Sequence, residues 1–349
     1  MSSRKKCSLV LGLVFTLIFA VAFVMPTSVY SQAGKQIEWR MQNMFPTGDL
    51  SYELQGKRIV DSLNQKLAGK LHITQYLPGQ IVPADQMFDS LSKGVFDAAI
   101  LGSSWRVGFT PEAVVAFGLP MGWENVDQVF EFFYKFGMLK MQRTVCAEKN
   151  VLYACPLPCS PVTITSNFPF RKVEDIKGKK IWSIAGTAAY VKNLGGAPVT
   201  FPPSEIYMGM KLGTLDGMIY SLAELETAGY KEVVKYINWP ATVDPNSVEF
   251  DISLKSWNAL PPDVQKTIED TLVEIGPPMA KEYIAEDHKG VEAAVKVGVQ
   301  EIHMDPSEVP KARAAAVKVW ADFAARSPRT AQCVQMLKDF LVTKGVKVD

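Results

Sequence analysis

The side chains that most often carry out chemistry are few in this sequence and form no familiar catalytic arrangement. Its 349 residues include three histidines, His72, His288 and His303, each in a segment of ordinary surface character. The patterns G-x-S-x-G, H-E-x-x-H, G-x-x-x-x-G-K-[ST] and G-x-G-x-x-G are all missing. Pairs such as Glu224 and Glu226 could do acid–base work, but such pairs arise by chance among 36 acidic residues. We therefore expect no catalytic residue, no cofactor and no enzyme; a hydrolase using a cleft carboxylate is the alternative.

The first 31 residues have the pattern of a secretory signal. Arg4, Lys5 and Lys6 precede an apolar run over residues 8–24, and small polar residues follow it. A retained membrane anchor is the alternative, because the run approaches the length of a membrane-spanning helix. Cleavage would remove three positive charges from a chain of net charge +1 and leave about −2. We expect a soluble, weakly acidic protein in the periplasm of a Gram-negative bacterium.

Five cysteines are present, and their spacing does not predict a metal site. Cys7 precedes the apolar run, so it is not placed as a lipoprotein acceptor. Cys155 and Cys159 have no second Cys or His pair that would complete a tetrahedral site. In an oxidising compartment one disulfide among Cys146, Cys155 and Cys159 is expected, with buried free thiols as the alternative. Cys333 is left outside that group, and no metal is predicted.

Length and charge limit the class of protein further. The chain is about twice the length of one ordinary domain, which predicts two domains. Hydrophobic residues make up 48% of it, enough for a large core. Lys and Arg number 37 against 36 Asp and Glu, and no basic stripe is visible, so a nucleic acid partner is not expected.

Apolar runs alternate with amphipathic stretches from Gln36 onward, which is typical of α/β domains with parallel strands. Ser204 is expected to cap a helix that ends at Gly213. Pro277 and Pro278 are expected to break a long helix that begins near residue 261. Strands are predicted at 37–41, 71–76, 96–101, 162–166, 180–183, 199–201 and 248–254, and helices at 51–67, 84–92, 185–194 and 204–212. The remainder, 280–344, is predicted to be helical with one extended interruption around 299–304.

Two stretches of this text resemble a known family. They are GQIVPADQMFDSLSKG at residues 79–94 and DIKGKKIWS at 175–183, the second followed by GGAPVTFPPSEIYMGMKLGTLDGMIYS at 195–221. Together they resemble the periplasmic substrate-binding subunits of TRAP transporters, the DctP-type family, nearest the branch that binds 2-oxo acids and lactate. The resemblance implies a two-domain α/β clamp with hinge strands and a long connecting helix. Such a clamp closes on a small molecule and delivers it to membrane permease subunits.

The same resemblance implies how the chain is divided. Domain I would comprise residues 36–159 and 248–279, and domain II residues 160–247 with the C-terminal part 280–349. Members of this branch can pair, so a homodimer is left open. A sensor that presents its ligand to a membrane receptor is a further alternative to transport.

Three positions depart from the family pattern. Trp182 stands where most members carry a carboxylate-binding Arg, and Ile219 with Tyr220 stands where the 2-oxo acid branch has a metal-holding Glu-Trp pair. Thr163 takes the place of a Gln. An unpartnered carboxylate in a closed cleft is costly. We therefore expect Arg106 to replace the missing cation, ahead of Arg40 and Arg171, or the ligand not to be a simple carboxylate.

Aromatic residues are concentrated on the segments that line the cleft in the family. Such rings could stack on an aromatic ligand or cage a quaternary ammonium. We therefore expect a ligand with an aromatic or apolar body, an acid in that case being held by Arg106. The family's ordinary small carboxylate, bound through rearranged contacts, is the alternative. The predicted ligand-binding residues are Trp182, Tyr220, Arg106, Trp105, Thr163, Phe45, Ile219 and Asn43.

Overall fold

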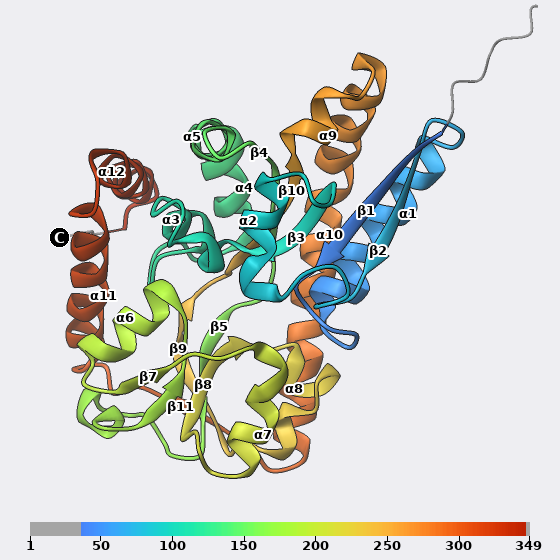
Figure 1. Ribbon diagram of the computed structural model, residues 1–349. Coiled ribbons are helices and arrows are strands. Elements are labelled where there is room, and N and C mark those ends of the chain that lie inside the picture. Colours follow the sequence, from blue (N-terminus) through green and yellow to red (C-terminus); the bar gives the residue numbers. More distant parts are fainter. Residues whose placement is uncertain (1–35, 347–349) are drawn as a thin grey trace, which may run out of the picture. The chain divides into compact units, whose positions relative to one another are not determined.

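The computed structural model describes residues 36–346, which form an α/β structure built on two sheets (Figure 1). The predicted signal segment, Cys7 included, lies outside the described residues. The described residues form one compact unit. No helix among the described residues is long and apolar enough to cross a membrane.

The first sheet, sheet A, contains five strands in the order β2-β1-β3-β10-β4. β1 is parallel to β2 and to β3, whereas β10 runs antiparallel to both of its neighbours. The expected β-α-β rhythm is thus confirmed at the start of the chain. The strands are β1 (Ile37–Asn43), β2 (Leu71–Tyr76), β3 (Ala98–Gly102), β4 (Val151–Pro158) and β10 (Ser247–Ser253).

The second sheet, sheet B, contains six strands in the order β11-β9-β5-β8-β6-β7. Here β5 is the strand that runs antiparallel to both neighbours. Each sheet therefore holds one reversed strand, β10 in sheet A and β5 in sheet B. The strands are β5 (Val162–Ser166), β6 (Lys180–Trp182), β7 (Ala197–Val199), β8 (Gly217–Ser221), β9 (Tyr236–Val243) and β11 (Gln300–His303).

Both reversed strands begin where the chain passes from one sheet to the other. The first crossing joins β4 to β5 through Cys159, and the second joins β9 to β10 through Asn246. The amide of Cys159 donates to the carbonyl of Asn246 at 2.9 Å, and the amide of Asn246 donates to the carbonyl of Ser160 at 3.0 Å. The sheet membership changes close to the domain boundaries predicted from the sequence, which themselves stay a prediction.

Helices cover both sheets. α1 packs against β2, α4 and α5 pack against β4, and α11 packs against α6 and α12. The sequence analysis missed β4, β9 and the helices between residues 113 and 147. The shorter helices are α1 (Lys57–Lys66), α2 (Met87–Ser92), α3 (Ala113–Phe117), α4 (Val126–Tyr134), α5 (Met138–Ala147), α6 (Ala185–Asn193), α7 (Ile206–Lys211), α8 (Glu224–Thr227), α9 (Leu254–Asn258), α11 (Val309–Ala324) and α12 (Pro328–Thr343).

Two local predictions around α7 have different outcomes. Ser204 is not the cap of this helix, because a 3-10 turn over Pro203–Glu205 leads into it and no side chain caps it. Gly213 does follow its end, with a φ of +71° that glycine adopts without strain. The strand expected at 199–201 lies two residues earlier, at β7.

The longest helix, α10 (Pro262–Lys296), contradicts the predicted break at Pro277 and Pro278. Gly276 has no Cβ to clash with the ring of Pro277, so the helical conformation is tolerated before this proline. The prolines leave the carbonyls of Val273 and Glu274 without helix donors. Both of these residues are largely exposed, so water can take the donors' place. α10 packs against α1 and against β4 of sheet A, and it also packs against α8, which follows β8 of sheet B (Figure 1). This packing stabilises the continuous helix.

The contact of α10 with α8 depends on a glycine. A Cβ at Gly290 would lie 2.4 Å from the carbonyl oxygen of Leu222. We predict that Gly290→Ala lowers the free energy of unfolding by about 1–3 kcal/mol, because backbone atoms must shift to admit the methyl group. Urea unfolding measures it, with the exposed neighbour Lys289→Ala as the control. Equal stability of the two variants would contradict the contact.

Candidate functional site

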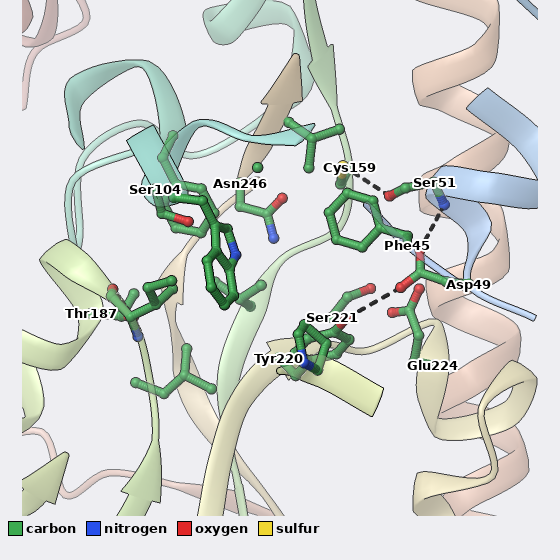
Figure 2. Close-up of a pocket in the computed structure, with 18 of the residues that line it drawn as sticks. Phe45, Asp49, Ser51, Ser104, Cys159, Thr187, Tyr220, Ser221, Glu224 and Asn246 are labelled. Carbon is green, nitrogen blue, oxygen red and sulfur yellow. Dashed lines mark hydrogen bonds between the residues drawn. The ribbon is translucent and has the colours of Figure 1, made fainter. Parts of the chain in front are cut away.

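A cavity lies where the carboxyl ends of strands from both sheets meet. It spans about 580 Å³ of space free of protein atoms, part of which is open to solvent. Its lining comes from the residues that follow β1, β3, β4, β6, β7 and β8 and from the crossing at Asn246. Ligands of open α/β sheets bind at this end of the strands. We call this space the cavity (Figure 2).

Aromatic and aliphatic side chains form most of the cavity wall. The rings of Trp182 and Tyr220 meet edge to face at a centroid distance of 5.4 Å, and Tyr220 meets Tyr230 in the same way at 5.7 Å. The indole Nε1 of Trp182 donates to the carbonyl of Phe201 at 3.0 Å, which fixes the ring. The other apolar lining residues are Phe45, Trp105, Phe117, Val162, Ile184, Pro203, Ile219 and Val248.

Two buried carboxylates, Asp49 and Glu224, lie at one side of the cavity (Figure 2). One Asp49 oxygen accepts the amide N–H of Ser51 at 2.8 Å, and the other accepts the hydroxyl of Tyr220 at 3.2 Å. Glu224 Oε1 accepts the hydroxyl of Tyr283 at 3.1 Å. The loop after β1 thus presents one carboxylate, and the start of α8 presents the other.

Their surroundings disfavour the charged forms. Burial raises the pKa of Asp49 well above its usual range, and the nearby charge of Glu224 raises it further. Burial likewise raises the pKa of Glu224. Two carboxyl groups that influence one another in a desolvated site cannot both ionise easily without a compensating charge.

Polar atoms of the cavity are short of hydrogen-bond partners. Oδ1 of Asn246 is buried with none, and Oε2 of Glu224 has only the neighbouring hydroxyl of Ser221 as a donor. Among the residues the structure describes, no Lys, Arg or His lines the cavity. The cavity therefore combines aromatic walls with unpaired acceptors and two acidic groups.

Comparison with known proteins places this arrangement in a family. The sequence model described as "Bacterial extracellular solute-binding protein, family 7", DctP, matches residues 44–327. The chain belongs to this family. The TRAP resemblance predicted from the sequence is thereby confirmed, as is the fold class of a two-domain α/β periplasmic binding protein.

Relatives of this family 7 protein agree in fold and differ in bound molecule. A "Monocarboxylate 2-oxoacid-binding periplasmic protein" of Nostoc is 26% identical over 73% of this chain and 70% of its own length. A TRAP solute-binding protein of Chromohalobacter salexigens, solved with (S)-2-amino-1-propanol, has a TM-score of 0.80 at 22% identity, covering 88% of this chain and 96% of that one. One of Pseudoalteromonas atlantica, with sodium and pyruvate, has a TM-score of 0.78 at 20% identity, covering 88% and 94%.

The structure brings five of the eight predicted ligand-binding residues of the family 7 protein to the cavity. Phe45, Trp105, Trp182, Ile219 and Tyr220 all line it. Their role in binding a ligand stays a prediction. Arg106, Thr163 and Asn43 do not line it.

Arg106 is a correction to the sequence analysis. Its guanidinium is fully buried in sheet A, where Nη2 donates to Glu249 Oε2 at 3.0 Å and Nε donates to the other oxygen of the same carboxylate. The remaining donors contact Thr110 and Gln142, each at 2.6 Å. With its donors engaged in the core, Arg106 cannot serve as the cation of the cavity. Arg40 and Arg171 do not line the cavity either.

Thr163 and Asn43 do not line the cavity, and their side chains form hydrogen bonds to backbone groups. The hydroxyl of Thr163 donates to the carbonyl of Asn238 on β9, so it is used within sheet B. The side chain of Asn43 donates to the carbonyl of Ser51 at 3.0 Å and accepts the amide of Phe45 at 3.0 Å. Asn43 therefore shapes the loop that carries Phe45 and Asp49.

Sequence reasoning missed the polar part of the cavity. Asp49, Ser221, Glu224, Asn246 and Tyr283 were not predicted, although Glu224 was noted as one of many acidic pairs. The sequence could have indicated Asp49 and Glu224 by their position alone, because each follows the carboxyl end of a strand, where ligands of open α/β sheets bind.

The four cysteines within the described part of the chain are free and buried. Of the two alternatives, the structure thus favours free thiols over a disulfide. Burial raises the pKa of the Cys159 thiol to about 12, so it stays protonated at neutral pH.

The Arg106–Glu249 pair generates a stability prediction. Arg106→Met leaves a buried carboxylate without its partner, so we predict a loss of about 3–5 kcal/mol in the free energy of unfolding. The double variant Arg106→Met with Glu249→Met should recover most of that loss. Urea unfolding measures both, and a single variant as stable as wild type would contradict the structural role of this pair.

A pH prediction follows from Asp287 on α10. Its carboxylate accepts the hydroxyl of Ser160 and is otherwise desolvated, and burial raises its pKa to about 8. Since the folded-state pKa lies above the unfolded value of about 3.9, this group favours the folded state most at low pH and loses that contribution as the pH rises through about 8.

We therefore predict that Asp287→Asn is more stable than wild type at alkaline pH and that its advantage shrinks as the pH falls. Unfolding curves at several pH values measure the difference, with half-buried Glu286→Gln, one residue earlier on the same helix, as the control. Parallel stability profiles of wild type and Asp287→Asn would contradict the assignment.

Proposed function

We propose that this family 7 protein captures a small organic molecule in the cavity and delivers it to the membrane permease subunits of a TRAP transporter. The carrying observation is the aromatic-walled cavity at the carboxyl ends of strands from both sheets. Binding would favour the closed arrangement of the two sheets by its differential affinity. A binding role also agrees with the absence of a nucleophile–base pair around the cavity within residues 36–346.

Export belongs to the same proposal. The basic and apolar segments of residues 1–31 would direct the chain to the periplasm, where the permease can receive the ligand. Cell fractionation followed by N-terminal sequencing of the recovered protein checks this step.

The proposed ligand has an aromatic or otherwise apolar body that contacts the rings. Trp182, in place of the family's usual Arg, supplies a stacking surface and no charge. The alternative, a small 2-oxo or 2-hydroxy acid, is supported by the name of the Nostoc relative and by pyruvate in the Pseudoalteromonas protein. The cavity lining offers such an acid no cation among the described residues.

A ligand screen by thermal shift tests the proposal. The mature chain is unfolded and refolded to remove any carried-over ligand, then screened against aromatic acids, 2-oxo acids, amines and polyols. A ligand at 100 times its Kd adds about 2.7 kcal/mol and raises Tm by several degrees. We predict such a shift for compounds with an apolar body, and loss of about tenfold in affinity in Trp182→Ala.

Trp239→Ala is the matched control, because this indole lies outside the cavity and donates to Glu301 at 2.8 Å. It should leave the affinity unchanged. A screen in which no compound shifts Tm, or in which Trp182→Ala and Trp239→Ala behave alike, would contradict a binding function for this cavity.

A further inference from the structure

The charges around the cavity point to a more specific ligand class, which rests on the proposed binding function. We propose that the ligand is a small organic ammonium ion, with its positive nitrogen beside Asp49 and Glu224 and its apolar body against the rings of Phe45, Trp182 and Tyr220. The inference rests on burial, on unpaired acceptors and on the aromatic wall.

The two acidic side chains of the cavity have no cationic partner in the described chain. Asp49 and Glu224 are 5% and 1% exposed. Neither forms an ion pair with a Lys, Arg or His of the described chain. Burial of carboxylates without a partner costs several kcal/mol each, and that cost is recovered when a cation enters beside them. An ammonium ligand supplies the missing charge.

The cavity also contains hydrogen-bond acceptors that lack donors. Oδ1 of Asn246 is a buried acceptor without a donor, and Oε2 of Glu224 has only the neighbouring hydroxyl of Ser221 as a donor. Figure 2 shows Asn246, Ser221 and Glu224 around the same space. A primary, secondary or tertiary ammonium donates an N–H to such atoms, whereas a quaternary ammonium such as choline supplies only its charge and a ligand carboxylate has no hydrogen to donate.

The aromatic wall of the cavity also suits a cation. A cation beside the face of Trp, Tyr or Phe is attracted by the negative face of the ring, and more strongly when it is desolvated. Apolar residues such as Ile184, Val162 and Ile219 continue this surface and suit a hydrocarbon body. A bare metal ion would instead need several oxygen ligands, and no cluster of three His, Cys, Asp or Glu occurs among the described residues.

Protonation distinguishes a cation from an anion. In the empty cavity burial keeps the pKa of both carboxyl groups raised, and a bound cation favours their ionised forms. Cation binding must therefore release protons and weaken as the pH falls. Binding of a carboxylate must take up protons and tighten as the pH falls. The other titratable groups that face the pair are Tyr220, Tyr230, Tyr283, Cys159 and Asp287.

Isothermal titration of the mature protein with shape-matched probes tests the inference. One set is choline, its neutral isostere 3,3-dimethyl-1-butanol and the anion 3,3-dimethylbutanoate; the other is benzylamine, benzyl alcohol and benzoate. We expect the cation of at least one set to bind at least tenfold more tightly than its neutral and anionic partners, in keeping with a charge-assisted contact. Its affinity should fall toward acid pH, with proton release that scales with buffer ionisation enthalpy.

The variants Glu224→Gln and Asp49→Asn should each weaken binding of the cation by about tenfold or more and reduce its pH dependence, because one of the two titrating carboxyl groups is lost. Glu226→Gln is the matched control, since this residue lies on the same helix, pairs with Lys231 at the surface and does not line the cavity. Circular dichroism and unfolding of each free variant show that it is folded. If one variant does not fold, the other carries the comparison.

Different results would overturn the ammonium inference and the proposed binding function. Tighter binding of the anion or the neutral probe, still reduced in Trp182→Ala, would overturn the ammonium inference and leave the binding function standing. Cation binding that is equal in Glu224→Gln, Asp49→Asn and Glu226→Gln would also overturn the inference. Absence of binding by every probe and by every compound of the wider screen would overturn both.

Discussion

The two crossings of the chain between its sheets are the constraint on which the rest of this structure depends. Cys159 and Asn246 lie on opposite crossings and are joined by a backbone hydrogen bond, with a second from Asn246 to Ser160. Because each crossing begins a reversed strand, the remaining strands of both sheets direct their carboxyl ends to one place. Loops from distant parts of the sequence can then line a single cavity, and α10 contacts elements of both sheets.

Within that cavity, desolvation decides what a side chain can do. Arg106 has the charge that an organic acid requires, but each of its three guanidinium nitrogens donates to Glu249, Thr110 or Gln142 in the core. Asp49 and Glu224 are acidic groups with raised pKa values and have no cationic partner around the cavity within the described chain. With an ammonium ligand as proposed, the family scaffold is kept while the charge preference of its cavity is reversed, and Trp182 stands where the family resemblance predicts an Arg.

Much of the fold could be predicted because it depends on local pattern. Strands β1, β2 and β5 follow from apolar periodicity, and Gly213 from its position after α7. The failures have tertiary causes. α10 continues through Pro277 and Pro278 because Gly276 removes a clash and both ends of the helix are packed, and β4 and β9 are defined by neighbours that lie far away in sequence. In the cavity the rings were predicted from family positions. The acids were not, because a carboxylate on a loop looks the same whether it faces water or a closed space.

A crystal structure of the mature protein with its tightest-binding ammonium compound tests the central claim most directly. The account predicts ligand density in the cavity, with the nitrogen within about 4 Å of carboxylate oxygens of both Asp49 and Glu224 and the apolar part against Trp182 and Tyr220. A ligand whose nitrogen faces away from both carboxylates, or one bound outside the cavity, would contradict it.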